Sequence, residues 1–121
     1  MAIDYGEKRA GIASTDESGR FALPRAVWPN DKNLMGKVLK FKDEENIDKI
    51  VLGESKNFEG NYNPIQKEID KFRDDLQERG AEVIYHPELL TTLEAKQIQG
   101  QTEMTDASAA ALILKSYLDS K

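Results

Sequence analysis

Apolar and polar residues follow two rhythms along the chain, an alternation of period two in the first quarter and a period near 3.6 in most of the rest. The chain opens on a short apolar strand that contains Asp4, and segments 9–15 and 21–27 continue as strands. The turn at 16–19 ends in Gly19, a natural site for positive φ. Proline has no N–H to donate to a neighbouring strand, so Pro24 predicts that the third strand lies at the edge of the sheet.

The remainder of the chain is predicted to alternate helices with two short apolar strands. Asp31 and Thr105 are the expected N-caps of the first and last helices. The predicted helices cover 32–45, 64–80, 91–99 and 106–119, and the predicted strands cover 49–53 and 82–86. Helices between strands favour parallel pairing through right-handed crossovers, with the fourth strand beside the first. The pattern therefore predicts an α/β fold whose five-stranded mixed sheet has three antiparallel strands and then two parallel ones, flanked by helices.

Length and composition narrow the class of protein. The 121 residues predict a single domain over 1–121, and the absence of cysteine excludes disulfides and zinc–thiolate sites. No apolar run approaches the roughly 20 residues needed to cross a bilayer, and no signal peptide is visible. We therefore expect a cytoplasmic protein with no membrane partner; the sequence leaves monomer and dimer open.

The net charge of −5 argues against a protein that grips nucleic acid with a bulk positive field. It leaves room for a local basic patch, or for metal ions that bridge acids to phosphates.

Four acids stand where predicted elements end or begin. Asp4 lies on the first strand, Glu54 and Glu88 follow the two apolar strands, and Asp106 starts the last helix. Ligands of open α/β sheets bind at the carboxyl ends of parallel strands, near a topological switch point. Clustered carboxylates favour hard cations such as Mg²⁺ or Mn²⁺. Two such ions can activate a water and stabilise the leaving oxygen of a phosphodiester.

Each acid also has a purely structural interpretation. In this interpretation, Asp106 complements the helix dipole, Glu54 is a solvated loop acid and Glu88 is an ordinary surface acid. Asp4 is the hardest to explain in this way, because it interrupts a strand that ought to be buried. The neighbouring Gly6 is expected to adopt a backbone conformation that a Cβ would resist.

Candidate substrate contacts come from two loops. Lys8 and Arg9 flank the Asp4 hairpin and are positioned to meet phosphates or to pair with nearby acids. Lys56 lies in a polar loop with two aromatic residues, which either stack on unpaired bases or simply pack. His86 is interpreted as a strand-end residue rather than a ligand or a general base.

These residues together resemble the YqgF/RuvX family of Holliday-junction-resolvase-like proteins, which have an RNase H-like fold. The resemblance covers almost the whole chain and rests on four segments in the family's order. They are IDYGEKRAGIASTD at 3–16, DKIVLG at 48–53, ELLTTLEA at 88–95 and DASAAALILKSYLDS at 106–120.

The resemblance implies a metal-dependent endonuclease that is associated with processing the 5′ end of the 16S ribosomal RNA precursor. The family's acids map onto Asp4, Glu88 and Asp106, and RuvC-type relatives carry an acid that corresponds to Glu54. The implied role of each is to hold Mg²⁺ or Mn²⁺, with water as the nucleophile. The implied substrate is nucleic acid, either an rRNA precursor or branched DNA.

The chain departs from the family at the substrate-binding positions. Where the family reads Asp-Glu-Arg-Leu-Thr-Thr, this chain reads Pro87-Glu88-Leu89-Leu90-Thr91-Thr92. The family's basic segment before the last Asp is short here and carries only Glu103. These departures motivate an alternative hypothesis, a catalytically weakened module that binds RNA, branched DNA or a protein partner without cleavage. A third idea is nucleotide binding, because Asp-x-Gly hairpins also occur in sugar-kinase and actin-like folds, but this chain is too short for their two-domain clamp.

Overall fold

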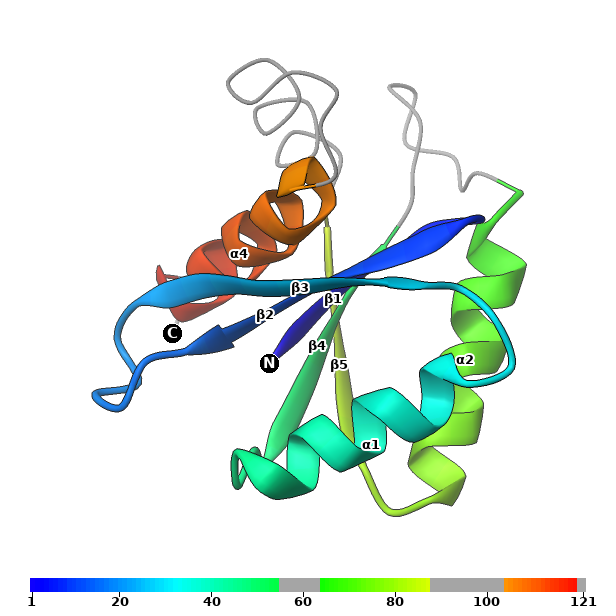
Figure 1. Ribbon diagram of the computed structural model, residues 1–121, viewed down its shortest axis with the longest axis horizontal. Coiled ribbons are helices and arrows are strands. Elements are labelled where there is room, and N and C mark those ends of the chain that lie inside the picture. The colour runs from blue at the N-terminus through cyan, green and yellow to red at the C-terminus, as the bar shows by residue number, and fades with distance from the viewer. Residues whose placement is uncertain (55–63, 88–103, 120–121) are drawn as a thin grey trace.

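Five strands form one mixed sheet with helices on both of its faces in the computed structural model (Figure 1). The structure describes residues 1–54, 64–87 and 104–119. The strands are β1 (Ala2–Tyr5), β2 (Arg9–Thr15), β3 (Ala22–Pro29), β4 (Lys49–Glu54) and β5 (Glu82–Pro87). The helices are α1 (Leu34–Glu44), α2 (Gln66–Glu78) and α4 (Met104–Asp119).

The strand order is β3-β2-β1-β4-β5, which places β1 at the centre of the sheet. β1 pairs with β2 in antiparallel fashion and with β4 in parallel fashion, and β4 in turn pairs with β5 in parallel fashion. The predicted fold class, the place of the fourth strand beside the first and the edge position of the Pro24 strand are therefore all confirmed. The positive φ of 73° at Gly19 confirms the predicted turn.

Alternating residues of the strands feed two apolar layers, one on each face of the sheet. One layer joins the sheet to α1 and α2, and its buried residues include Ile3, Ile12, Leu52, Leu34, Val38, Ile69 and Leu76. The other joins the sheet to α4 through Ala2, Ala13, Val51, Ala110, Ile113 and Leu114. Because side chains alternate along a strand, these two layers fix which face every strand residue occupies.

Two helix starts differ from the sequence prediction. The last helix begins at Met104, so Thr105 is not its N-cap and that prediction is wrong; Asp106 is the third residue of the helix. α1 begins at Leu34, and Asp31 does not cap it but accepts a hydrogen bond of 2.9 Å from the backbone N–H of Asn33. The short helix predicted over 91–99 lies outside the described residues.

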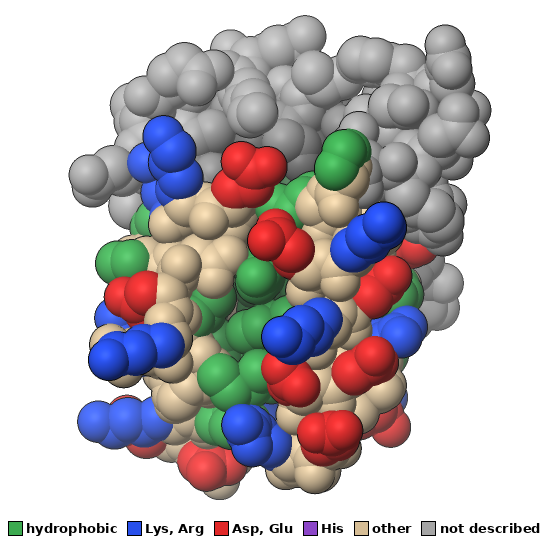
Figure 2. All heavy atoms as spheres, turned by 90° about the vertical axis from the view of Figure 1, so that its right-hand side faces the viewer, with side chains coloured by type: hydrophobic (Ala, Val, Ile, Leu, Met, Phe, Trp, Pro, Cys, Tyr) green, Lys and Arg blue, Asp and Glu red, His purple; other side chains and the backbone are tan. Residues whose placement is uncertain are grey.

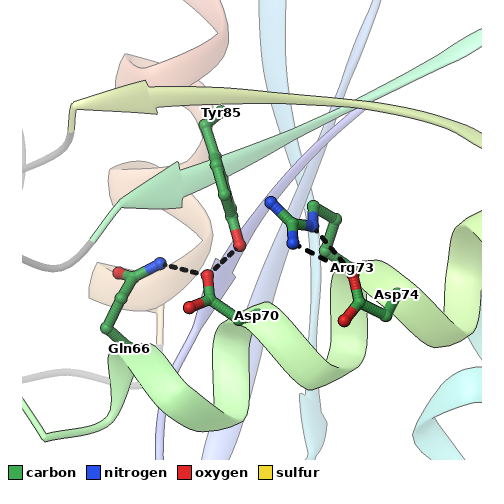
Figure 3. Close-up of polar contacts among 5 residues, drawn as sticks. All are labelled: Gln66, Asp70, Arg73, Asp74 and Tyr85. Atoms are coloured by element: carbon green, nitrogen blue, oxygen red, sulfur yellow. Dashed lines mark hydrogen bonds and ion pairs between the residues drawn. The ribbon is translucent and has the colours of Figure 1, made fainter.

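A polar cluster ties α2 to the edge strand β5 (Figure 3). The Asp70 carboxylate accepts hydrogen bonds from the Tyr85 hydroxyl and, at 2.9 Å, from the Gln66 side-chain amide. The Arg73 guanidinium lies 5.0 Å from the centre of the Tyr85 ring. The hydrogen bond from Tyr85 is the main reason that the pKa of Asp70 lies below its usual range. Burial, followed by that hydrogen bond, raises the pKa of Tyr85.

We predict that Tyr85→Phe lowers the free energy of unfolding by about 1 kcal/mol near neutral pH, the usual contribution of one hydrogen bond. Because the pKa of Asp70 is lowered in the folded state, its stabilisation is present above its unfolded pKa and lost as pH falls through its folded pKa. The difference between wild type and variant should therefore shrink in acid. Urea denaturation at neutral and acidic pH measures it, with Tyr5→Phe as control, and an equal loss at both pH values contradicts the assignment.

Candidate active site

Asp4 lies on the central strand, on the face that α4 covers. Ala2 packs against α4, and Asp4 is two residues further along β1, so alternation directs it to the same face. The side chain is half-buried. A half-buried carboxylate between two paired strands is costly unless a cation or a hydrogen-bonding partner accompanies it.

Glycines are the neighbours of Asp4 in both adjoining strands. Asp4 pairs directly with Gly11 of β2. Ile3 pairs with Leu52, so the parallel register continues with Gly53 beside Asp4. Neither glycine has a side chain to shield the carboxylate. Within the sheet, Asp4 is thus bordered by glycine backbone rather than by large side chains, which lets a ligand approach closely.

The carboxyl ends of β4 and β5 and the start of α4 lie at the same end of the sheet, the end at which these two strands stop (Figure 1). The backbone of Asp106 lies in the first turn of α4 at this end. Glu88 and Lys56 lie outside the described residues, as does the side chain of Asp106. The grouping of these acids with Asp4 therefore stays a prediction.

Glu54 and Asp4 differ in the face of the sheet toward which their side chains point. Glu54 is the half-buried last residue of β4. Val51 faces α4 and Leu52 faces α1 and α2, so alternation directs Glu54 to the face opposite Asp4. To share a ligand with Asp4, the Glu54 side chain has to reach around the end of β4.

The hairpin between β1 and β2 carries the two described candidate cations. Lys8 and Arg9 are both exposed, and alternation puts Arg9 on the α4 side with Gly11. Asn30 holds this hairpin at two points. Its side-chain amide donates to the Gly6 carbonyl at 2.7 Å, and its backbone N–H donates to the Lys8 carbonyl at 2.9 Å. Sequence reasoning missed Asn30, and its only signal was its place directly after the third strand.

A second contact that the sequence did not predict links β5 to α4. Nε2 of His86 and Oγ of Ser116 are hydrogen bonded at 2.8 Å. The His86 ring also meets the Tyr117 ring edge-on, with 6.3 Å between their centres. His86 pairs with Gly53, so it lies on the α4 face one strand beyond the neighbour of Asp4.

Within the described ranges, no three His, Cys, Asp or Glu side chains converge as a metal site. A cleft of about 770 Å³ lies at the opposite end of the sheet, where β1 and β4 begin. Its lining includes Met1, Arg25, Glu45 and Lys49. Of the predicted site residues whose side chains the structure describes, Asp4, Lys8, Arg9 and Glu54, none lines this cleft.

The described surface offers little bulk attraction for phosphates. Figure 2 shows Lys and Arg side chains interspersed with Asp and Glu on the side that carries α2. Oppositely charged side chains also pair on α1, where Lys40 and Glu44 are 3.8 Å apart. None of the helices that the structure describes is long and apolar enough to cross a membrane.

Comparison with known proteins gives a family match over nearly the full length. The family model described as "RuvX: Holliday junction resolvase" matches residues 1–120. A protein of Chlorobium phaeobacteroides named "Putative pre-16S rRNA nuclease" is 30% identical over 98% of this chain and 90% of its own length. A protein of the same name from Syntrophus aciditrophicus is 33% identical over 98% of this chain and 87% of its own.

Solved structures share the fold at lower identity. The fowlpox virus resolvase in complex with Holliday junction DNA superposes with a TM-score of 0.56 at 16% identity, over 98% of this chain and 95% of that one. RuvC of Thermus thermophilus gives a TM-score of 0.56 at 14% identity, over 97% of this chain and 94% of that one. Both are similar to this chain in fold.

Substitution by alanine should have opposite effects on stability at Gly6, in the hairpin beside Asp4, and at Gly36, in helix α1. A Cβ on Gly6 would lie 2.6 Å from the Arg9 carbonyl oxygen, whereas a Cβ on the helical Gly36 meets nothing within 4 Å. Gly6→Ala should therefore destabilise the fold by about 1–3 kcal/mol, because the backbone has to move. Gly36→Ala should stabilise it by up to about 1 kcal/mol through helix propensity. Thermal unfolding of both variants checks this, and a Gly6→Ala protein as stable as wild type contradicts it.

Proposed function

The chain belongs to the RuvX family, and we propose that it is a divalent-metal-dependent endonuclease that hydrolyses phosphodiesters in structured nucleic acid. The observation that carries the proposal is Asp4, a half-buried carboxylate on the central strand whose paired neighbour is Gly11. An apolar side chain would pack against α4 at a lower cost of desolvation, so the half-buried carboxylate is the chemically distinctive group of this strand.

The donor set fits a hard cation. Asp4, Glu88 and Asp106 would hold Mg²⁺ or Mn²⁺, with Glu54 as a possible fourth ligand, and all four offer carboxylate oxygens. The chain contains no cysteine and a single histidine, so softer metals find few of the ligands they prefer. When bound, such ions would supply activation of a water and stabilisation of the leaving oxygen.

The protein's own residues would bind and orient the substrate. Arg9 and Lys8 are exposed at the hairpin next to Asp4, where each can pair with a phosphate. Asn30 donates hydrogen bonds to the backbone carbonyls of Gly6 and Lys8, which holds the backbone of the hairpin that carries both cations. α4 covers the sheet face on which Asp4 lies.

For the substrate, we propose the 5′ region of a 16S rRNA precursor, in line with the names of relatives at 30% and 33% identity. Branched DNA is the other structured substrate to test, since a resolvase of similar fold binds a Holliday junction. With a net charge of −5 and only Lys8 and Arg9 as described candidate phosphate contacts, we expect weak binding in the absence of metal and a shallow dependence on salt.

A second candidate function is binding without cleavage. It is favoured by Pro87 and Leu89, which stand where the resembling family has Asp and Arg. Specific RNA or protein binding that resists EDTA, with no cleavage product, would support this candidate over the nuclease.

We predict that Asp4→Asn lowers the rate of cleavage by at least about a hundredfold, because it removes a charged ligand while keeping the shape of the side chain. The assay follows product formation from a labelled rRNA precursor and from a four-way junction with Mg²⁺ or Mn²⁺. The control is Asp48→Asn, an exposed acid at the far edge of the sheet. Full activity of Asp4→Asn with unchanged thermal stability rules out the proposed site.

Glu54 provides a graded test of the same site. Because alternation directs Glu54 away from Asp4, Glu54→Gln should slow cleavage less than Asp4→Asn does, by about tenfold or less. Rate measurements across a metal titration compare the two variants. Equal losses would show that Glu54 reaches around β4 and acts as a full ligand.

A further inference from the structure

The hydrogen bond between His86 and Ser116 joins two elements that lead to candidate metal ligands. His86 is the penultimate residue of β5, and Glu88 follows the end of that strand. Ser116 lies on α4, which carries Asp106 in its first turn. The 2.8 Å contact is a direct polar tie between these two elements.

The position of β5 relative to α4 has little other support on this face. β5 is the outermost strand, and among the described strands it pairs only with β4. α4 packs mainly against β2 and β3, at the other side of the sheet. Its apolar layer uses Ala2, Ala13 and Val51, and no β5 residue belongs to the described part of that layer. The distance between the ends of β5 and α4 therefore depends strongly on His86, Ser116 and the adjoining Tyr117 ring.

We propose that His86 and Ser116 are positioning residues, which set the separation of the two elements that carry Glu88 and Asp106 and thereby tune metal affinity. The inference rests on the proposed function. Neither residue touches the metal in this account; each acts through the acids at the ends of β5 and α4. Hydrogen bonds made directly to metal ligands change metal affinity by about 10–100-fold, and the His86–Ser116 bond, which holds the two elements and not a ligand, should act at the lower end of that range.

The alternative is that the pair only stabilises the fold, and two variants separate the two roles. Ser116→Ala removes a hydroxyl but raises helix propensity, so it should cost little stability. His86→Phe keeps an aromatic ring to meet Tyr117 and removes both ring nitrogens. Ser116→Thr retains the hydroxyl and is the conservative variant that should rescue affinity.

The experiment is calorimetric titration of the full chain with Mn²⁺, with thermal unfolding of each variant measured alongside. Ser116→Ala and His86→Phe should bind Mn²⁺ about tenfold more weakly than wild type, and Ser116→Thr should stay within about threefold. Ser18→Ala is the matched control, since it removes a hydroxyl hydrogen bond to Asp16 in a remote hairpin. It should leave Mn²⁺ affinity unchanged.

The outcomes distinguish this inference from the proposed function. If Asp4→Asn abolishes Mn²⁺ binding while Ser116→Ala and His86→Phe bind as wild type does, the positioning role is overturned and the metal site stands. If wild type binds no Mn²⁺ at millimolar concentration, the metal site is overturned and the positioning role falls with it. Weaker binding that tracks lost thermal stability in both variants supports the purely structural role and also overturns the inference.

Discussion

Strand β1 is hydrogen bonded to β2 on one side and to β4 on the other, and the other elements are arranged so that this short strand is buried. Ile3 points into the layer beneath α1 and α2, while Ala2 points toward α4. Asp4 follows on the α4 side, where a half-buried carboxylate needs a polar or cationic partner. The fold tolerates the carboxylate because the strand ends there, at an edge where a cation or polar substrate can reach it.

The two faces of the sheet differ in the size of the side chains that pack on them. The layer under α1 and α2 uses large side chains such as Leu52, Ile69 and Leu76, which supply most of the apolar burial. The layer under α4 uses alanines, among them Ala2, Ala13 and Ala110, next to two glycines of the sheet. Small residues let α4 approach closely, so its first turn comes to the sheet edge at which β4 and β5 end. One face thus anchors the sheet, and the other carries the proposed site.

Much of this arrangement followed from local patterns, and the failures have physical reasons. Alternation gave the bounds of β2 correctly, and the proline in the third strand correctly placed it at the edge, because both effects act within a few residues. Thr105 failed as a cap because a helix start depends on tertiary packing as well as on a capping side chain. The expectation that a Cβ would be resisted at Gly6 is confirmed, because a Cβ there would lie 2.6 Å from the Arg9 carbonyl oxygen. The contacts of Asn30 and His86 join residues far apart in sequence, which no local pattern encodes. The grouping of the acids with Asp4 stays a prediction.

The central claim is that the Asp4 carboxylate holds a divalent cation, and anomalous diffraction tests it most directly. Crystals grown or soaked with Mn²⁺ and measured near the manganese absorption edge should give an anomalous peak at coordination distance from an Asp4 oxygen. The same soak of Asp4→Asn crystals should show no peak there. Manganese found only elsewhere, such as at the acids of the cleft where β1 and β4 begin, with the Asp4 carboxylate free of metal, would contradict the account.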